Sequence, residues 1–190
     1  MTNSDQLVLD KKNIDTILVL DFGSQYTQLI ARRIRELDVF SIILPWDISK
    51  ERILEINPTG IILSGGPESV TNNNTPRIPE IIFDLDIPIL GICYGMQTLA
   101  EQFGGQVTAS KTKEFGHASI TLEQASILFD GFDDGSLVDV WMSHGDHVSS
   151  LPDQFILIAS TPSAPIAAMA HSKKPIYALQ FHPEVTHTKE

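Results

Sequence analysis

Residues 88–105 read PILGICYGMQTLAEQFGG, and this stretch carries the pattern that decides the fold. The apolar run Pro88–Ile92 is typical of a short buried strand, and Gly95–Phe103 has the apolar spacing of a helix. The two glycines that follow are a stop signal for that helix. Cys93, the only cysteine of the chain, lies at the junction. The sequence therefore predicts a strand that turns sharply into a helix at this cysteine.

The same alternation of apolar runs and helical stretches extends upstream. Strands are predicted at Thr16–Leu20, Val39–Leu44 and Gly60–Leu63. Helices are predicted at Gln25–Leu37 (with Ser24 as its N-cap), Ile48–Ile56 and Ile78–Leu85. Such alternation predicts an α/β fold: a single open, mostly parallel twisted sheet with helices on both faces. Ligands of such sheets bind beyond the carboxyl ends of the strands, so the turns that follow these strands are expected to form the site.

The second half of the chain has short strand-like runs separated by turns instead. These predict antiparallel strands added to the main sheet, at Ala118–Leu122, Val138–Met142, Phe155–Ser160, Ile166–His171 and Ile176–Gln180. The polar segment Ser69–Pro76 is predicted to be a mobile loop. We expect one domain over residues 14–190, preceded by a polar N-terminal extension at residues 1–13.

The composition excludes several classes of protein. Of the 190 residues, 42% are hydrophobic, which suits a globular domain, and the formal net charge is −11. An acidic chain without a basic patch predicts no nucleic-acid partner. No run of about 18 apolar residues and no apolar leader is present, so no membrane partner is expected. A single cysteine excludes a disulfide framework and multi-cysteine metal sites, and it favours a cytoplasmic location.

The surroundings of Cys93 indicate a nucleophile. The stretch Gly91–Gly95 (GICYG) has the spacing of the nucleophile elbow G-x-S-x-G, with sulfur in place of oxygen. The glycines two residues before and two residues after the nucleophile leave room for the strand and the helix to meet at a strained turn. The first amides of the helix can then stabilise an oxyanion beside the sulfur. A lone cysteine is more often a small buried hydrophobic residue, but its place at a strand end favours the nucleophile.

His182 is the strongest candidate for the base among six histidines. It follows the last predicted strand, and Glu184 lies two residues further on, on the same face of an extended chain. Glu184 could accept a hydrogen bond from one imidazole nitrogen while the other nitrogen points to Cys93. Taken alone, His182 would be read as a solvated histidine in a C-terminal loop. Together with Cys93, a catalytic triad is favoured.

A second histidine cluster lies at His144–His147 (HGDH). Two histidines and a carboxylate can bind zinc or iron, but this spacing matches no metal-binding motif, so no metal site is expected. Because the cluster follows the predicted strand Val138–Met142, we expect it to form a substrate-facing loop.

The glycine-rich stretch Ser64–Ser69 (SGGPES) has two interpretations. It resembles superficially the pyrophosphate loop of ATP pyrophosphatases, which directs backbone amides at phosphate. Pro67 removes one of those donors, and a polar loop stands where a helix should follow, so nucleotide binding is disfavoured. The other interpretation is an oxyanion hole, in which the amides of Gly66 and Tyr94 converge on one oxygen, as acyl transfer requires.

Five stretches together resemble the class I (triad) glutamine amidotransferases. Three are general to that class: the elbow at Gly91–Gly95, the Gly-Gly-Pro at Gly65–Pro67 and the His-Pro-Glu at His182–Glu184. Two others, Asp21–Tyr26 (DFGSQY) and Ser143–Asp146 (SHGD), resemble the GMP synthase branch of the family. The resemblance runs over nearly the whole chain and implies a flavodoxin-like class I glutaminase fold.

The resemblance also implies roles for particular residues. It implies a catalytic triad of Cys93, His182 and Glu184. It implies an oxyanion hole formed by the amides of Gly66 and Tyr94. It implies contacts to the substrate, L-glutamine, from Gly65, Gln97, Ser143, His144, Gly145 and Asp146.

The partner implied by the resemblance is an ATP pyrophosphatase domain or subunit that adenylates XMP and uses the ammonia to make GMP. ATP and Mg²⁺ are expected only in that part, and glutamine hydrolysis itself is expected to need no cofactor. The chain is then either a free-standing glutaminase subunit or one domain of a longer enzyme. The alternatives from the residues alone are another triad amidase or γ-glutamyl hydrolase on the same fold, and a non-catalytic regulatory binding module.

Overall fold

The computed structural model describes residues 15–188, without the side chains of residues 110–113. The predicted N-terminal extension, residues 1–13, lies outside the described residues, so the domain boundary stays a prediction. Within residues 15–188, no helix is both long enough and apolar enough to cross a membrane.

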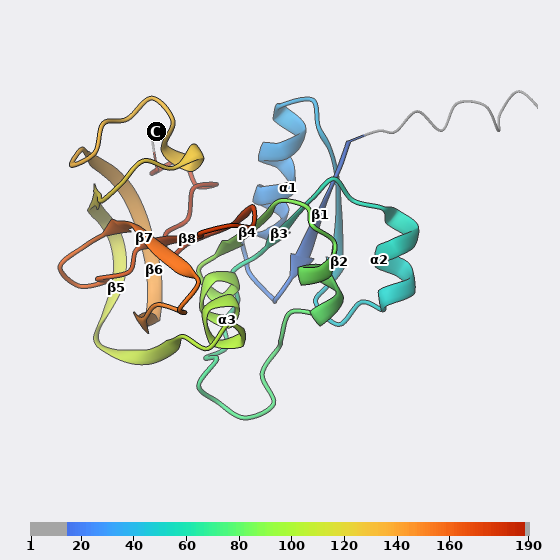
Figure 1. The fold of residues 1–190 in the computed structure, drawn as a ribbon, viewed down its shortest axis with the longest axis horizontal. Coiled ribbons are helices and arrows are strands. Elements are labelled where there is room, and N and C mark those ends of the chain that lie inside the picture. The colour runs from blue at the N-terminus through green and yellow to red at the C-terminus, as the bar shows by residue number, and fades with distance from the viewer. Residues whose placement is uncertain (1–14, 189–190) are drawn as a thin grey trace, which may run out of the picture.

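The described residues form one sheet of nine strands, in which a parallel half adjoins an antiparallel half (Figure 1). The first five strands in spatial order are parallel, and the remaining pairs are antiparallel. This arrangement confirms the predicted fold class. In spatial order the strands are β2 (Phe40–Pro45), β1 (Thr16–Asp21), β3 (Gly60–Leu63), β4 (Ile89–Ile92), β9 (Ile176–Leu179), β8 (Ala168–His171), β7 (Phe155–Ser160), β5 (Gln106–Leu122) and β6 (Leu137–Ser150).

The last strand of the chain, β9, lies between the parallel and antiparallel halves. It pairs in parallel with β4, where Ile92 faces Leu179, and antiparallel with β8. The carboxyl ends of β4 and β9 therefore lie side by side, and the residues that follow them meet at one edge of the sheet. Cys93 follows β4 directly, and His182 comes three residues after β9.

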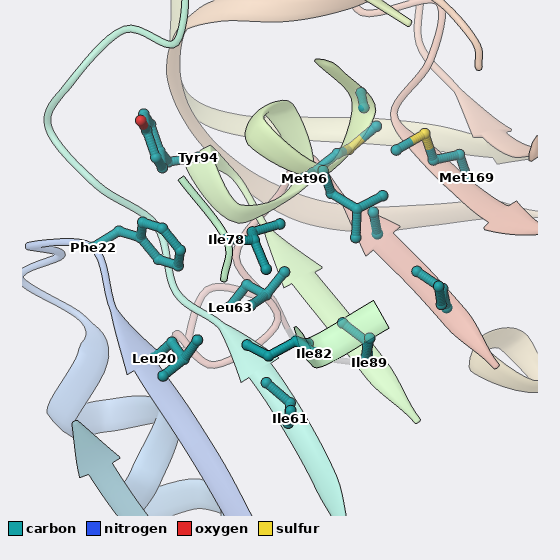
Figure 2. Packing of buried hydrophobic residues seen from close by; sticks show 14 of the residues in the cluster. Leu20, Phe22, Ile61, Leu63, Ile78, Ile82, Ile89, Tyr94, Met96 and Met169 are labelled. Atoms are coloured by element: carbon teal, nitrogen blue, oxygen red, sulfur yellow. The ribbon is translucent and has the colours of Figure 1, made fainter. Parts of the chain in front are cut away.

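Helices cover both faces of the parallel half, as predicted. The side chains of β1 alternate between the faces: Leu18 and Leu20 pack in the cluster that includes Ile53 of α2 (Lys50–Ile56) and Leu99 of α3 (Tyr94–Gln102). Val19 points the other way and packs with Ile30 of α1 (Thr27–Glu36). This alternation follows from the two-residue period of a strand. Figure 2 shows the first cluster, with Ile82 beside Leu63 and Ile89.

Two predicted helical features differ in the structure. The segment predicted as a helix at Ile78–Leu85 is a 3₁₀ helix, η1, over Glu80–Asp84. The side chain of Gln102 binds both the N–H and the carbonyl of Ile78, at 2.9 and 3.0 Å, so Ile78 is held on α3 outside the short helix. Ser24 is not the N-cap of α1, because that helix begins at Thr27 and Tyr26 occupies the cap position.

The two long strands β5 and β6 extend beyond the predicted ranges. The prediction placed strands at Ala118–Leu122 and Val138–Met142, but β5 begins at Gln106 and β6 continues to Ser150. The added parts are polar, so they lack the apolar alternation that marks a half-buried strand. Their pairing is irregular between Ala109 and Glu114, where the four residues 110–113 of β5 stand opposite the single residue Gly145 of β6.

The tight crossing of α3 over β3 gives a testable prediction. A methyl group on Gly95 would overlap the carbonyl group of Leu63 and approach its Cβ to 2.8 Å, with backbone that has no room to move. We expect Gly95→Ala to lower the free energy of unfolding by about 3 kcal/mol, measured by urea denaturation. Gly60→Ala is the control, since its methyl group would meet the flexible end of Ile17 at 3.0 Å and should cost about 1 kcal/mol or less. Equal losses in the two variants would contradict this account.

Candidate active site

Cys93 stands at a strained turn between β4 and α3. Its φ of 52° and ψ of −106° are unfavourable for a residue with a side chain, and its backbone N–H donates to the Leu179 carbonyl of β9 at 2.7 Å. A methyl group on Gly91 would lie 2.9 Å from the backbone of Gly95, so the turn needs glycine at both positions. The turn thus has the geometry expected of a nucleophile elbow.

The loop after β1 is shaped by its own side chains. The Asp21 carboxylate accepts hydrogen bonds from the N–H of Gly23 at 2.8 Å and from the hydroxyl of Thr27 at 2.7 Å. Ser24 accepts from the N–H of Tyr26 at 3.0 Å. These local bonds bring the ring of Tyr26 to the edge of the His182 ring, with the centroids 5.0 Å apart.

His182 and Glu184 form a buried pair at the carboxyl end of β9. Nδ1 of His182 lies 2.7 Å from Oε1 of Glu184, and their side chains are only 4% and 3% exposed. The N–H of His182 donates to the Trp141 carbonyl of β6 at 3.0 Å, and Nε of Arg33 on α1 donates to the Glu184 carbonyl at 3.0 Å. The ring is therefore fixed through its backbone and through one nitrogen.

The other partner of His182 is Cys93. Burial alone would lower the pKa of His182, but hydrogen bonds to the Cys93 thiol and to Glu184, together with their charges, outweigh burial and raise it to about 9. The structure thus brings the three predicted triad residues together, from β4 and from the segment after β9. Their catalytic roles remain a prediction at this point.

The two predicted oxyanion donors lie on adjacent turns. Gly66 follows β3, and a methyl group there would lie 2.6 Å from the Phe22 carbonyl and 3.3 Å from the ring of Tyr94, so only glycine fits. Within residues 15–188, neither the N–H of Gly66 nor that of Tyr94 donates to a protein acceptor. The two amides are thus available beside Cys93, as an oxyanion hole requires.

Ser64, at the start of the same turn, argues against a phosphate loop. Its side chain is fully buried, accepts from the N–H of Phe22 at 3.0 Å and donates to the Gly65 carbonyl at 2.8 Å. Residues 64–79 form turns and no helix. A hydroxyl that is occupied inside the protein and a loop without a helix N-terminus do not suit pyrophosphate binding.

The predicted substrate-facing loop at His144–His147 is a strand, because these residues and Ser143 continue β6 in its pairing with β5. The Ser143 carbonyl accepts from the Cys93 thiol at 3.6 Å. The Asp146 carbonyl accepts from the side-chain amide of Gln97 at 2.8 Å, which links β6 to α3. The structure therefore brings this segment to Cys93, although as an edge strand.

His144 is buried inside this part of β6. Its Nε2 lies 3.0 Å from Oε2 of Glu114 on β5, without the alignment of a hydrogen bond. Burial lowers the pKa of His144, and the charge of Glu114 opposes this effect only in part. Within the described residues, no cluster of three or more histidine, cysteine or acidic side chains is arranged to hold a metal ion.

These elements line an open cavity of about 540 Å³ beside Cys93 and His182. The sequence-based prediction assigned a role to eight of the seventeen residues that line it. The turn after β1 was expected to form part of the site, but none of its residues was assigned a role. Strand β5 was not expected at the site, because its polar sequence gives no strand signal. The lining residues without a predicted role are Gly23, Ser24, Gln25, Tyr26, Pro67, Glu68, Ser69, Ala109 and Phe115.

The arrangement is that of an enzyme that attacks a carbonyl carbon with a thiol: a cysteine at an elbow, a buried histidine–carboxylate pair and two free amides beside one cavity. A profile of the family described as "Glutamine amidotransferase class-I" matches residues 18–190. The chain therefore belongs to the class-I glutamine amidotransferase family, and the expected family membership is confirmed.

Individual relatives point to one branch of this family. The chain is 59% identical to a glutamine-hydrolyzing GMP synthase from Hahella chejuensis over 179 residues, 90% of this chain, and 57% identical to that from Pseudomonas putida over 180 residues, 92% of this chain. In both comparisons it spans 34% of the relative's length, about a third.

Solved structures agree with this relationship. A Thermoplasma acidophilum protein assigned as one subunit of a GMP synthase superposes with a TM-score of 0.81 at 36% identity, over 93% of this chain and 87% of that one. A glutamine amidotransferase from Thermotoga maritima shares the fold, with a TM-score of 0.71 at 22% identity over 90% of this chain and 77% of that one.

The buried histidine pair predicts a pH dependence of stability. Because folding raises the pKa of His182 from 6.5 to about 9, the stabilisation by its proton is complete below pH 6.5 and is lost as the pH rises through 9. We expect Glu184→Gln to lower the pKa of His182 and to move this loss to lower pH, measured by NMR titration of the ring and by urea unfolding across the pH range. Glu123→Gln is the control, because Glu123 follows β5, binds Ser160 and does not influence the pKa of His182, so both properties should stay unchanged. An unaltered pKa in Glu184→Gln would contradict the pairing.

Proposed function

We propose that the chain hydrolyses the side-chain amide of L-glutamine to glutamate and ammonia through a thioester on Cys93. The observation that carries this proposal is the thiol itself: it stands at a strained elbow, within hydrogen-bonding reach of a buried histidine–carboxylate pair, on a cavity of about 540 Å³. Membership of the glutamine amidotransferase family supports glutamine as the substrate.

In the first half of the reaction, His182 takes the proton of the Cys93 thiol and the sulfur attacks the amide carbon of glutamine. The electron pair of the C=O bond moves to oxygen, and the resulting oxyanion faces the amides of Gly66 and Tyr94. When the oxyanion collapses, the C–N bond breaks and His182 gives its proton to the departing nitrogen. Ammonia leaves, and a glutamyl thioester remains on Cys93.

In the second half, water attacks the thioester carbon and His182 accepts the proton of the water. The oxyanion forms again at the same two amides, and its collapse breaks the C–S bond, returns the proton to sulfur and releases glutamate. Glu184 keeps the imidazole oriented and stabilises its cationic form in both halves. No step requires a metal ion or an organic cofactor.

The cavity walls supply the proposed substrate contacts. Gly65 lies between the reacting groups: a methyl group there would approach Cε1 of His182 to 3.3 Å and Cβ of Cys93 to 3.6 Å. Its missing side chain leaves the space that the glutamine amide needs. The wall of β6 with Gln97 of α3 offers polar groups for the amino-acid end of the substrate, from Gln97, Ser143, His144, Gly145 and Asp146.

The ammonia is proposed to serve the amination of XMP to GMP. This rests on the relatives named as GMP synthases and on the chain's match to about a third of their length, which leaves room for a synthetase part that binds ATP, Mg²⁺ and XMP. The partner is that ATP pyrophosphatase domain or subunit, and the place of action is the cytoplasm. No nucleic-acid or membrane partner is part of the proposal.

An electrophilic glutamine analogue tests the nucleophile. We expect the analogue to modify Cys93 alone, because the chain has one thiol and it faces the cavity, with the site located by peptide mass spectrometry. Cys93→Ala should show no modification and no release of ammonia from glutamine, a loss of at least about 10³-fold in rate. Glutamine should protect Cys93 from the analogue.

The same experiment separates the other functions. Modification of another residue, or equal modification of Cys93→Ala, would show that the nucleophile is assigned wrongly. An amidase of a different substrate would leave glutamine intact while it hydrolysed other γ-glutamyl compounds. A binding module would hold glutamine and release no ammonia, even after a synthetase part is added.

A further inference from the structure

The segment after His182 folds back onto the strand that supports it. The backbone N–H of Thr188 donates to the Val185 carbonyl at 3.2 Å and closes a turn, and the ring of His187 packs on that of Trp141 with centroids 4.4 Å apart. The turn places the side chain of Thr188 beside the backbone of His182, outside the triad and the oxyanion hole.

The hydroxyl of Thr188 completes an interrupted backbone pair. In an antiparallel pair two facing residues exchange both N–H···O bonds. Here the N–H of His182 donates to the Trp141 carbonyl at 3.0 Å, but the N–H of Trp141 donates to Oγ1 of Thr188 at 3.1 Å. The same hydroxyl then donates to the His182 carbonyl at 2.7 Å. One side-chain oxygen thus stands in for the missing backbone bond.

This bridge, which the Thr188 hydroxyl forms between the backbones of His182 and Trp141, connects the two sides of the site. His182 is on one side. On the other, Trp141 is two residues before Ser143, whose carbonyl accepts from the Cys93 thiol at 3.6 Å. A bond from the backbone of the histidine to the strand that contacts the thiol sets the distance between the two groups, and the hydroxyl of Thr188 donates and accepts through the same oxygen.

We propose that Thr188 is a positioning residue, which acts through His182 and Trp141 to hold the imidazole at the Cys93 thiol. The inference deepens the proposed function by naming a residue outside the triad that the triad depends on. It concerns the reactivity of the thiol, so it can be tested without glutamine.

The test measures how fast iodoacetamide alkylates Cys93 between pH 5 and pH 10 in the full chain. Thr188→Val keeps the shape and removes the hydroxyl, whereas Thr188→Ser keeps the hydroxyl. We expect alkylation at neutral pH to fall by about tenfold or more in Thr188→Val and to stay within about twofold of the unaltered chain in Thr188→Ser. The pH at which the rate reaches half its maximum should rise in Thr188→Val only.

Thr186→Val is the matched control, because Thr186 is exposed two residues earlier in the same turn. It should leave the rate and the pH profile unchanged. If Thr188→Val does not fold by circular dichroism, Thr188→Ala replaces it in the comparison with Thr188→Ser.

A Thr188→Val chain with the unaltered rate and pH profile would overturn the inference, and so would a Thr188→Ser chain that loses as much reactivity as Thr188→Val. A chain that releases no ammonia from glutamine, but whose alkylation depends on the hydroxyl of Thr188, would contradict the proposed function and leave the positioning role intact. The two failures are therefore distinguishable.

Discussion

The strained backbone of Cys93 is the constraint on which the rest of the site depends. A φ of 52° is unfavourable for a residue with a side chain, and favourable packing around the turn has to offset this cost in free energy. Gly91 and Gly95 let strand and helix approach without a clash, and the bond from the N–H of Cys93 to β9 fixes the turn against its neighbour. The thiol is thereby held above the edge of the sheet, next to the free amide of Tyr94 at the start of α3.

The order of the strands then brings the histidine to this thiol. A chain that added its strands in sequence would place β5 beside β4, but here β9 takes that position and the antiparallel strands lie beyond it. The carboxyl ends of β4 and β9 consequently share one edge. Three residues after the end of β9 are therefore enough to bring His182 to Cys93. Glu184 and the bridge at Thr188 fix the ring from the other side. The site is thus a property of the topology as well as of its motifs.

Much of this arrangement could be predicted from the sequence, because the parallel half has strong local signals. Apolar runs mark β1 to β4, and the GICYG and HPE stretches identify the ends of the two central strands. The polar half of β5 and the continuation of β6 beyond Met142 could not be predicted, since they lack the apolar alternation that marks a half-buried strand. For the same reason Phe115 of β5 was missed at the cavity. The 3₁₀ helix at Glu80–Asp84 depends on Gln102, which binds Ile78 from 24 residues away, a contact that no local pattern reveals.

The most direct test of the account is to trap the covalent intermediate with the natural substrate. The chain is mixed with saturating glutamine, quenched in acid within the first turnovers and digested for peptide mass spectrometry. The account predicts one glutamyl group on the peptide that contains Cys93, formed as ammonia is released and lost when the quench is delayed until glutamine is exhausted. Release of ammonia with no glutamyl group on Cys93 at any time, or with the group on another residue, would contradict the central claim that the elbow thiol attacks the glutamine amide.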